Sequence, residues 1–267
     1  YHAAEIQPRI FEQIRYASFT SLSSHTTEAT NEDGTKPAID AAEATTITLA
    51  KSVIETTSEH SIHDFPRGTQ AGLCLHELLE NFDFTQSASN QTQAIVSTLQ
   101  RYGFATEWLP AVLSMLDVTR LTTLSNGHTL ANTPAEQRLP EMGFTLHMSN
   151  FNLPHLRRWF AQNHLQLPQE FIAAAKSLDF NALSGFLNGF IDMTCQDNQG
   201  NICLIDYKSN YLGENENAYT ESAMNSAMAE HHYYLQALVF AIAVSRYFVT
   251  RCIPPNQITV RYQFSHD

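Results

Sequence analysis

The chain has 267 residues, 43% of them hydrophobic, and a formal net charge of −12 from 15 basic and 27 acidic residues. This hydrophobic fraction excludes a wholly disordered chain, and the length fits one α/β domain with an extension. The acidic balance argues against a domain that grips nucleic acid by itself, because phosphate binding needs basic surface. It leaves open a domain that cuts nucleic acid delivered by partners.

The start of the sequence and its cysteines indicate the cellular compartment to expect. The sequence begins at Tyr1 with no signal segment and no apolar run near the length of a bilayer span, so we expect a piece of a longer cytoplasmic chain with no membrane partner. The four cysteines show neither a CxxC pair nor metal-ligand spacing, which favours reduced and mostly buried thiols over a zinc or iron–sulfur site. They are Cys74, Cys195, Cys203 and Cys252.

The first 61 residues divide into a segment and a linker. A short helix is expected over residues 5–14, followed by an extended segment over residues 16–22. Residues 23–61 carry few large apolar groups, so little buried surface is available to offset the entropy of ordering them. We expect a flexible linker there, with a possible short helix at residues 47–53, and a folded domain over residues 62–267.

The first helix of the folded domain is predicted between Phe65 and Phe84. Thr69 is a suitable N-cap, and His76 and Glu80 lie at i, i+4 on one face of the helix. Beside them, apolar positions recur at helical spacing, at Leu75, Leu78, Leu79 and Phe82.

Later elements follow from the same periodicities. Alternation of apolar residues in the segment 138–148 predicts a half-buried strand, through Met142, Phe144, Leu146 and Met148. Helices are expected over residues 92–102, 107–116, 154–161, 169–178 and 219–249, the last interrupted near residues 231–234.

The most informative block is a predicted β-hairpin. Two apolar runs, at residues 185–195 and 202–205, flank a turn rich in Asn and Gly. Period-two geometry puts Asp206 and Lys208 on one face of the second strand. If the turn is centred on Gln199, Asp192 lies directly across from Asp206.

Two opposed carboxylates predict a cation. At about 5 Å and an effective dielectric of about 20 they repel by roughly 3 kcal/mol. Oxygen ligands suit Mg²⁺ or Mn²⁺, which can activate a water and stabilise charge on a phosphate, and Lys208 can assist as a second cation. An isolated Asp-x-Lys is more often an ordinary exposed strand feature. Here, however, Asp206 ends an apolar run, and a buried carboxylate needs a partner or a metal.

These residues also carry a family resemblance. Gly68-Thr-x-x-Gly-x-x-x-His76, Gly189-Phe-Ile-Asp192 and Leu204-Ile-Asp-Tyr-Lys-Ser-Asn-Tyr-Leu-Gly213 closely resemble the nuclease domain of the RecB family of exodeoxyribonuclease V, within the PD-(D/E)xK superfamily. The resemblance extends to Gln236. It implies an α/β fold with a restriction-endonuclease-like core, in which helices flank a mixed central sheet.

The resemblance also implies roles for single residues. It makes Asp192 and Asp206 metal-binding carboxylates, Lys208 the catalytic lysine and His76 a further ligand of Mg²⁺, a site that Mn²⁺ or Ca²⁺ could also occupy. Residues beside the metal or the substrate would be Glu80, Glu141 and Gln236. The family often places Tyr four residues after that glutamine, where this chain has Phe240, so a hydroxyl contribution is not expected there.

The implied function is Mg²⁺-dependent exonuclease action on DNA in double-strand-break repair and recombination. The implied partners are DNA, a helicase region upstream of residues 1–22 in the same chain, subunits like RecC and RecD, and RecA. No Gly-x-x-x-x-Gly-Lys-Ser/Thr loop is present, so ATP hydrolysis would lie elsewhere. Two alternatives are a catalytically silent nuclease-fold scaffold and an exonuclease of the superfamily with an iron–sulfur cluster. The first would lack the Asp/Asp/Lys set, and the second needs clustered C-terminal cysteines, whereas only Cys252 follows the hairpin.

Overall fold

The computed structural model describes residues 16–18, 60–125, 127–162, 167–178, 183–252 and 255–264. The helices expected at residues 5–14 and 47–53, and all but the last residues of the expected linker, lie outside these ranges. The extended segment expected at residues 16–22 contains strand β1 (Tyr16–Ser18).

Five strands form one mixed sheet centred on β5 (Leu183–Gln196). Strand β4 (Arg138–Phe151) runs antiparallel along one edge of β5. The other edge is shared: β1 pairs in parallel with Phe186–Asn188, and β6 (Ile202–Lys208) pairs antiparallel with the segment from Met193 to Gln196. Strand β7 (Ile258–Phe264) continues the sheet in parallel with β6. The expected mixed central sheet is confirmed, and β5 forks between β1 and β6 at residues 189–192.

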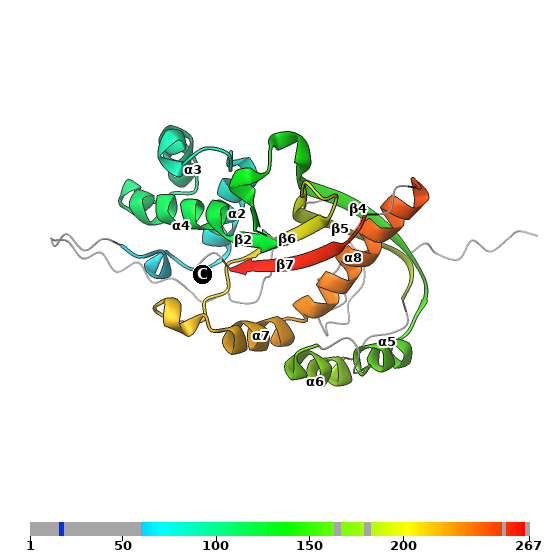
Figure 1. The fold of residues 1–267 in the computed structure, drawn as a ribbon. Coiled ribbons are helices and arrows are strands. Elements are labelled where there is room, and N and C mark those ends of the chain that lie inside the picture. Colours follow the sequence, from blue (N-terminus) through cyan, green and yellow to red (C-terminus); the bar gives the residue numbers. More distant parts are fainter. Residues whose placement is uncertain are drawn as a thin grey trace, which may run out of the picture.

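Helices cover both faces of this sheet. Figure 1 shows α2 (Thr69–Asn81), α3 (Thr92–Arg101) and α4 (Leu109–Leu121) gathered on one side, with α8 (Tyr233–Thr250) crossing the other. The buried residues of α2, α3 and α4 share a core with Met193 and Tyr207 of the sheet. A second core joins α8 to β5 and β6 through Ile191, Ile202, Leu204, Phe240 and Val244.

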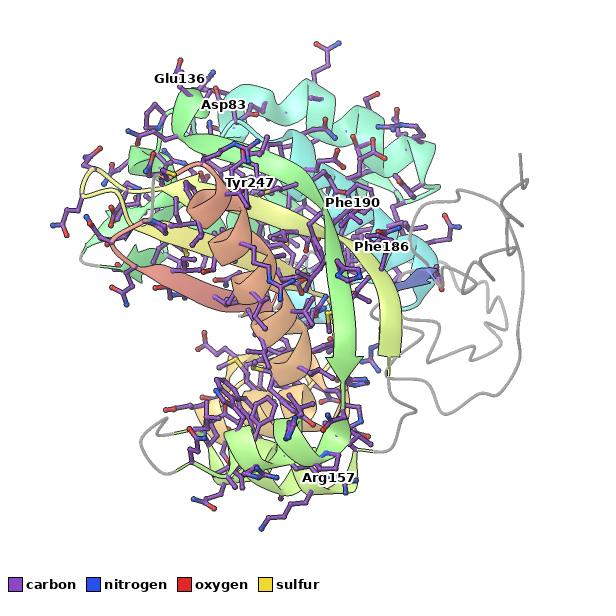
Figure 2. All side chains as sticks on the ribbon, turned by 90° about the vertical axis from the view of Figure 1, so that its right-hand side faces the viewer. Asp83, Glu136, Arg157, Phe186, Phe190 and Tyr247 are labelled. Carbon is purple, nitrogen blue, oxygen red and sulfur yellow. The ribbon has the colours of Figure 1, made fainter. Side chains whose placement is uncertain are left out.

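A small helical lobe extends from the sheet. It consists of α5 (Leu153–Phe160), α6 (Gln169–Ser177) and α7 (Glu221–Glu230), which share a buried cluster with the start of α8. In Figure 2, Arg157 marks α5 in this lower lobe, while Phe186 and Phe190 mark β5 above it.

Shorter elements complete the described structure. A two-stranded ribbon is formed by β2 (Thr123–Ser125) and β3 (His128–Thr129). Single turns of 3-10 helix lie at Ile62–Asp64, Ala88–Gln91, Thr106–Trp108, Leu130–Asn132, Ala135–Gln137 and Glu216–Ala218.

Most of the expected helices are confirmed, with one correction at the start of α2. The N-cap is Gly68, and Thr69, the expected cap, is the first helical residue, so its hydroxyl caps nothing. The reason is that the chain enters the helix with a φ of 107° at Gly68, which favours glycine. The apolar stripe of α2 is buried as expected, at Leu75, Leu78, Leu79 and Phe82. Helix α4 continues five residues beyond the predicted end at Leu116.

The C-terminal helical region is interrupted where the sequence predicts. Helix α7 ends at Glu230, and α8 begins at Tyr233 after His232, whose φ is 56°. Within the described part of the chain, α8 is long and apolar enough to cross a membrane by length and composition, with a mean hydropathy of 1.2. The expectation that no such run exists therefore does not hold for α8. Of its apolar side chains, Leu235 packs in the cluster of the helical lobe and Val244 packs against the sheet, and both are fully buried.

The alternation of β5 changes face beside the fork. Met193 packs with α2, whereas Ile191, two residues earlier, packs with α8. A regular strand would direct both side chains to one face of the sheet. In β4, the pairs Pro140–Met193 and Met142–Ile191 place Glu141 opposite Asp192, and Glu141 has a φ of 49°. The left-handed Glu141 therefore marks the point at which the two strands exchange their inward faces.

Two glycines of this strand pair give a stability test. A Cβ at Gly189 would lie 2.7 Å from the ring of Phe144, which packs edge-on against buried Phe240, so Gly189→Ala should cost about 1–3 kcal/mol of unfolding free energy. A Cβ at Gly143 would lie 3.3 Å from the exposed ring of Phe190, which can move away. Urea denaturation should find Gly143→Ala nearly neutral, and equal losses in the two variants would contradict this account.

Candidate active site

The turn of the β5–β6 hairpin fixes the register of the site. Asp197 accepts hydrogen bonds from the amides of Gln199 and Asn201 and from the side chain of Asn201, at 2.7–2.9 Å. Gly200, with a φ of 79°, completes the turn. The pairs from Gln196–Ile202 to Met193–Ile205 show that the hairpin is centred on Gln199, as predicted. The next position of this register belongs to Asp192 and Asp206.

Asp192 lies beyond the end of the β5–β6 ladder, inside the fork of the sheet. Its Oδ2 atom accepts a hydrogen bond of 2.7 Å from the backbone amide of Tyr207. The same oxygen lies 3.7 Å from Nδ1 of His76, which comes from α2, and the Asp192 side chain is 16% exposed. The carboxylate is thus held by a backbone donor of β6 and faces the histidine.

The surroundings of Asp192 disfavour its ionised form. Burial raises the pKa of Asp192 well above its ordinary value, and the nearby charges of Asp206 and Glu141 act in the same direction. The amide of Tyr207 and the ammonium group of Lys208 oppose this shift without cancelling it. The site therefore has a deficit of positive charge, which a cation would relieve.

Asp206, Lys208 and Gln236 form a closed triangle of polar contacts. The Lys208 ammonium lies 2.6 Å from Oδ2 of Asp206, and the two side chains are only 11% and 4% exposed. Gln236 of α8 donates from Nε2 to Oδ1 of Asp206 at 3.2 Å and accepts from Lys208 Nζ at 3.1 Å. Because β6 alternates, the carboxylate and the ammonium project to one face, where α8 supplies the glutamine.

Two tyrosines that were not predicted from the sequence surround Lys208. Its Nζ atom lies 3.8 Å from the ring centroid of Tyr233 and 5.6 Å from that of Tyr262. The two rings are stacked, and the Tyr262 hydroxyl donates to the carbonyl oxygen of Tyr233 at 2.6 Å. The available signals were the position of Tyr233, three residues before Gln236 on one helix face, and the alternation of residues 258–264, which indicates a strand.

The remaining predicted residues occupy different surroundings. His76 is partly exposed, and its ring lies edge-on to that of Tyr207 at 6.4 Å. Glu80 is exposed one turn further along α2. Glu141 lies within β4, in the segment predicted as a strand, and it is exposed opposite Asp192. Phe240 is buried in the core beneath α8, so no hydroxyl is presented at that position.

The donor set is suited to a hard cation only in part. His76, Asp192 and Asp206 come from three elements that meet at the fork, yet across the described ranges no three His, Cys, Asp or Glu side chains cluster closely enough to form a ready metal site. Asp206 instead faces Lys208. Both carboxylates are oxygen donors in a site that lacks positive charge, which fits Mg²⁺ better than a softer metal.

The cysteines are free thiols. Cys74, Cys195 and Cys203 are buried and Cys252 is exposed. Cys195 and Cys203 face each other across the hairpin, in the core beneath α2. The expectation of mostly buried, reduced cysteines is confirmed.

Comparison with curated proteins identifies relatives of the chain. It is 34% identical to the RecB subunit of the RecBCD enzyme of Escherichia coli K12 over 190 residues, which cover 69% of the chain. The whole chain is covered by the match to the RecB subunit of Haemophilus influenzae, at 30% identity. The match to the RecB subunit of Mycolicibacterium smegmatis covers 68% of the chain, at 26% identity. The chain spans only 15%, 22% and 19% of these relatives, in that order. No protein-family model matches the chain.

Two largely buried aspartates of the hairpin, Asp192 and Asp197, give opposite stability predictions in metal-free protein at pH 7. The pKa of Asp192 is higher in the folded than in the unfolded state, so ionisation of this carboxyl as the pH rises lowers the stability of the fold. Asp192→Asn removes the ionisable group and should therefore raise the free energy of unfolding by about 1 kcal/mol or more. Burial alone would raise the pKa of Asp197, but hydrogen bonds from Asn201 and Gln199 lower it, so this carboxylate stabilises the fold above its unfolded pKa. Asp197→Asn should cost about 1 kcal/mol.

The measurement is urea denaturation with a chelator present. A loss of stability in Asp192→Asn as large as that in Asp197→Asn would contradict the charge deficit at the fork.

Proposed function

Because the chain belongs to the RecB family, we propose that it is the nuclease domain of a RecBCD-type helicase–nuclease and hydrolyses DNA phosphodiester bonds with a divalent metal. The observation that supports this most directly is the convergence of Asp192, Asp206 and Lys208 at the fork of the sheet. Two largely buried carboxylates beside one lysine carry a high desolvation free energy, and groups of this kind concentrate at functional sites.

The proposal includes the setting of the domain. The nuclease domain would comprise residues 62–267, with β1 adding a strand to its sheet from the segment 1–22. Residues 23–61 would link the domain to a helicase region upstream. The protein would act in the cytoplasm as an exodeoxyribonuclease in double-strand-break repair and recombination, with RecC-like and RecD-like subunits and RecA as partners. Its net charge of −12 fits a domain to which partners deliver DNA.

His76, Asp192 and Asp206 would hold Mg²⁺, and Mn²⁺ or Ca²⁺ could take its place. The bound ion would supply positive charge to the attacking water and to the scissile phosphate. The raised pKa of Asp192 supports this assignment, because burial and the repulsion from Asp206 raise it and a bound cation would offset both. Glu141, exposed beside Asp192, adds negative charge on the open side of the same site.

Lys208 would stabilise charge that develops on the phosphate. Its ammonium is desolvated on the faces covered by Tyr233 and Tyr262, and Gln236 restrains it from a third direction. A preorganised cation in a partly buried site stabilises a transition state more than a mobile surface lysine does. Gln236 would position both Asp206 and Lys208, and the amide of Tyr207 would fix the orientation of Asp192.

The two alternatives lose support from the same geometry. A silent scaffold would have no need for a lysine restrained by a carboxylate, a glutamine and two aromatic rings. An iron–sulfur enzyme needs clustered thiolates, whereas Cys195 and Cys203 lie in the core and Cys252 lies exposed after α8. A colourless purified protein would exclude the cluster.

Variants of Lys208 and Asp206 test the proposed chemistry. In the full-length protein, Lys208→Met should lower the rate of DNA cleavage by a factor on the order of 10² or more, the usual scale for one preorganised group. Its affinity for Mn²⁺, measured by calorimetry, should be unchanged or slightly higher because a nearby positive charge is gone. Asp206→Ala should lose Mn²⁺ binding and cleavage together.

The matched control is Lys176→Met on α6, whose lysine is exposed in the helical lobe. It should cleave at the parental rate. Parental cleavage by a folded Lys208→Met protein would refute the assignment of Lys208, and undiminished Mn²⁺ affinity in Asp206→Ala would refute the metal site.

A further inference from the structure

An arginine is stacked on a tyrosine beside the candidate site. The guanidinium carbon of Arg67 lies 3.3 Å from the ring centroid of Tyr211, and the Arg67 side chain is exposed. Stacking of this kind contributes roughly 0.5–2 kcal/mol and fixes the plane of the guanidinium. The N–H groups of a stacked guanidinium remain directed outward along its edges, where they can bind a planar or tetrahedral anion.

Both residues flank elements that carry the site. Arg67 directly precedes Gly68, the N-cap of α2, and α2 carries His76. Tyr211 follows Lys208 by three residues, at the carboxyl end of β6. The two segments touch, since a Cβ at Gly72 of α2 would lie 3.2 Å from Oγ of Ser209. The stack is therefore at the same end of the sheet as the candidate metal ligands.

The tyrosine side of the stack is rigidly supported. Asn210, just before Tyr211, accepts a hydrogen bond of 3.1 Å from the hydroxyl of Tyr233. The amide of Leu212, just after it, donates to the hydroxyl of Tyr219 at 3.1 Å. Tyr219 is itself buried. A ring anchored on both sides holds the guanidinium in one place, which lowers the entropy cost of binding an anion.

Among the residues that the structure describes, no carboxylate neutralises the charge of Arg67. Several other cations of the described domain are paired: Arg101 with Glu77, Arg138 with Asp83, and Lys208 with Asp206. The guanidinium of Arg67 instead lies over the ring of Tyr211. In a chain with 27 acidic and 15 basic residues, an exposed arginine without an acidic partner beside a phosphodiester site is a specific source of attraction for a phosphate.

We infer that Arg67, held by Tyr211, binds a backbone phosphate of the DNA strand that is cut. The rise from Thr69 to His76 along α2 is about 10 Å, at 1.5 Å per residue, which equals the axial rise of roughly three nucleotides of one strand in duplex DNA, at 3.4 Å each. Arg67 would thus anchor the strand a few nucleotides from the scissile bond. The inference rests on the proposed function, and it concerns binding of the substrate instead of the chemical step.

Cleavage kinetics of the full-length protein on short single-stranded DNA test this role. Arg67→Gln should raise KM about tenfold with kcat within a factor of two, because the contact is made equally before and during the reaction. The slope of log KM against log salt should fall by about one unit, as for loss of one phosphate contact. Tyr211→Leu should raise KM in the same direction, whereas Tyr211→Phe, which keeps the ring, should resemble the parent.

The chain offers a matched control in a second arginine–tyrosine stack. The guanidinium carbon of Arg251, at the carboxyl end of α8, lies 3.6 Å from the ring centroid of Tyr247. Arg251→Gln removes the same charge and should leave KM and its salt slope unchanged. An equal effect in Arg67→Gln and Arg251→Gln would reduce the role of Arg67 to general charge and overturn the inference, as would an unchanged KM in Arg67→Gln.

A second readout separates this inference from the proposed function. In Ca²⁺, DNA containing 4-thiothymidine should crosslink under ultraviolet light to the segment 209–213 in the parent, and the crosslink should be lost in Arg67→Gln. If the parent forms this crosslink but never cleaves with Mg²⁺, the proposed function fails while the phosphate contact stands. If the parent cleaves but forms no crosslink at this segment, the phosphate contact is refuted and the proposed function is untouched.

Discussion

The geometry of the candidate site depends on one constraint: two carboxylates share a fork of the sheet with a single lysine. Lys208 neutralises Asp206 at 2.6 Å, which leaves Asp192 as the carboxylate whose pKa is raised by burial and by Asp206. Gln236 can satisfy both members of the ion pair because an amide is donor and acceptor at once. Lys208 and Gln236 thus occupy the two oxygen atoms of Asp206, whereas Asp192 has no ammonium partner of this kind and needs a cation more.

The fork itself results from how β5 is paired. One edge of β5 is occupied by β4 along nearly its whole length, but the other passes from β1 to β6, and Asp192 lies in the interval. A backbone amide of β6 that has no ladder partner there donates to the carboxylate instead. Parallel and antiparallel neighbours on one edge must diverge, and the divergence creates room for polar side chains between two hydrophobic cores.

Local sequence signals were sufficient for the hairpin and for the order of its side chains. The centre at Gln199 and the shared face of Asp206 and Lys208 follow from a turn and a period of two, which are properties of a few adjacent residues. The cap at Gly68 and the lysine's contact with Tyr262 could not be predicted in this way. The first depends on a backbone angle that only glycine readily adopts. The second depends on the parallel pairing of β6 with β7, in which Asp206 pairs with Tyr262, 56 residues later in the chain. Likewise, regular alternation predicts that Ile191 and Met193 point to the same face of the sheet. In the structure they point to opposite faces, next to Glu141, whose left-handed backbone breaks the alternation.

The face change at Glu141 and Asp192 has a functional logic. Regular alternation read forward from Ile191 would direct Asp192 only to the α2 side, and alternation read backward from Met193 would direct it only to the α8 side with Asp206. By exchanging faces at this position, β5 presents one carboxylate that contacts His76 from one layer while lying next to Asp206 and Lys208, which belong to the other. A strained φ at Glu141 is the local cost, on the order of 1–3 kcal/mol, and surrounding pairs of β4 with β5 on both sides hold it in place. Such backbone strain persists only where the surrounding structure enforces it. Here the strained residue lies directly opposite Asp192, on which the proposed metal site depends.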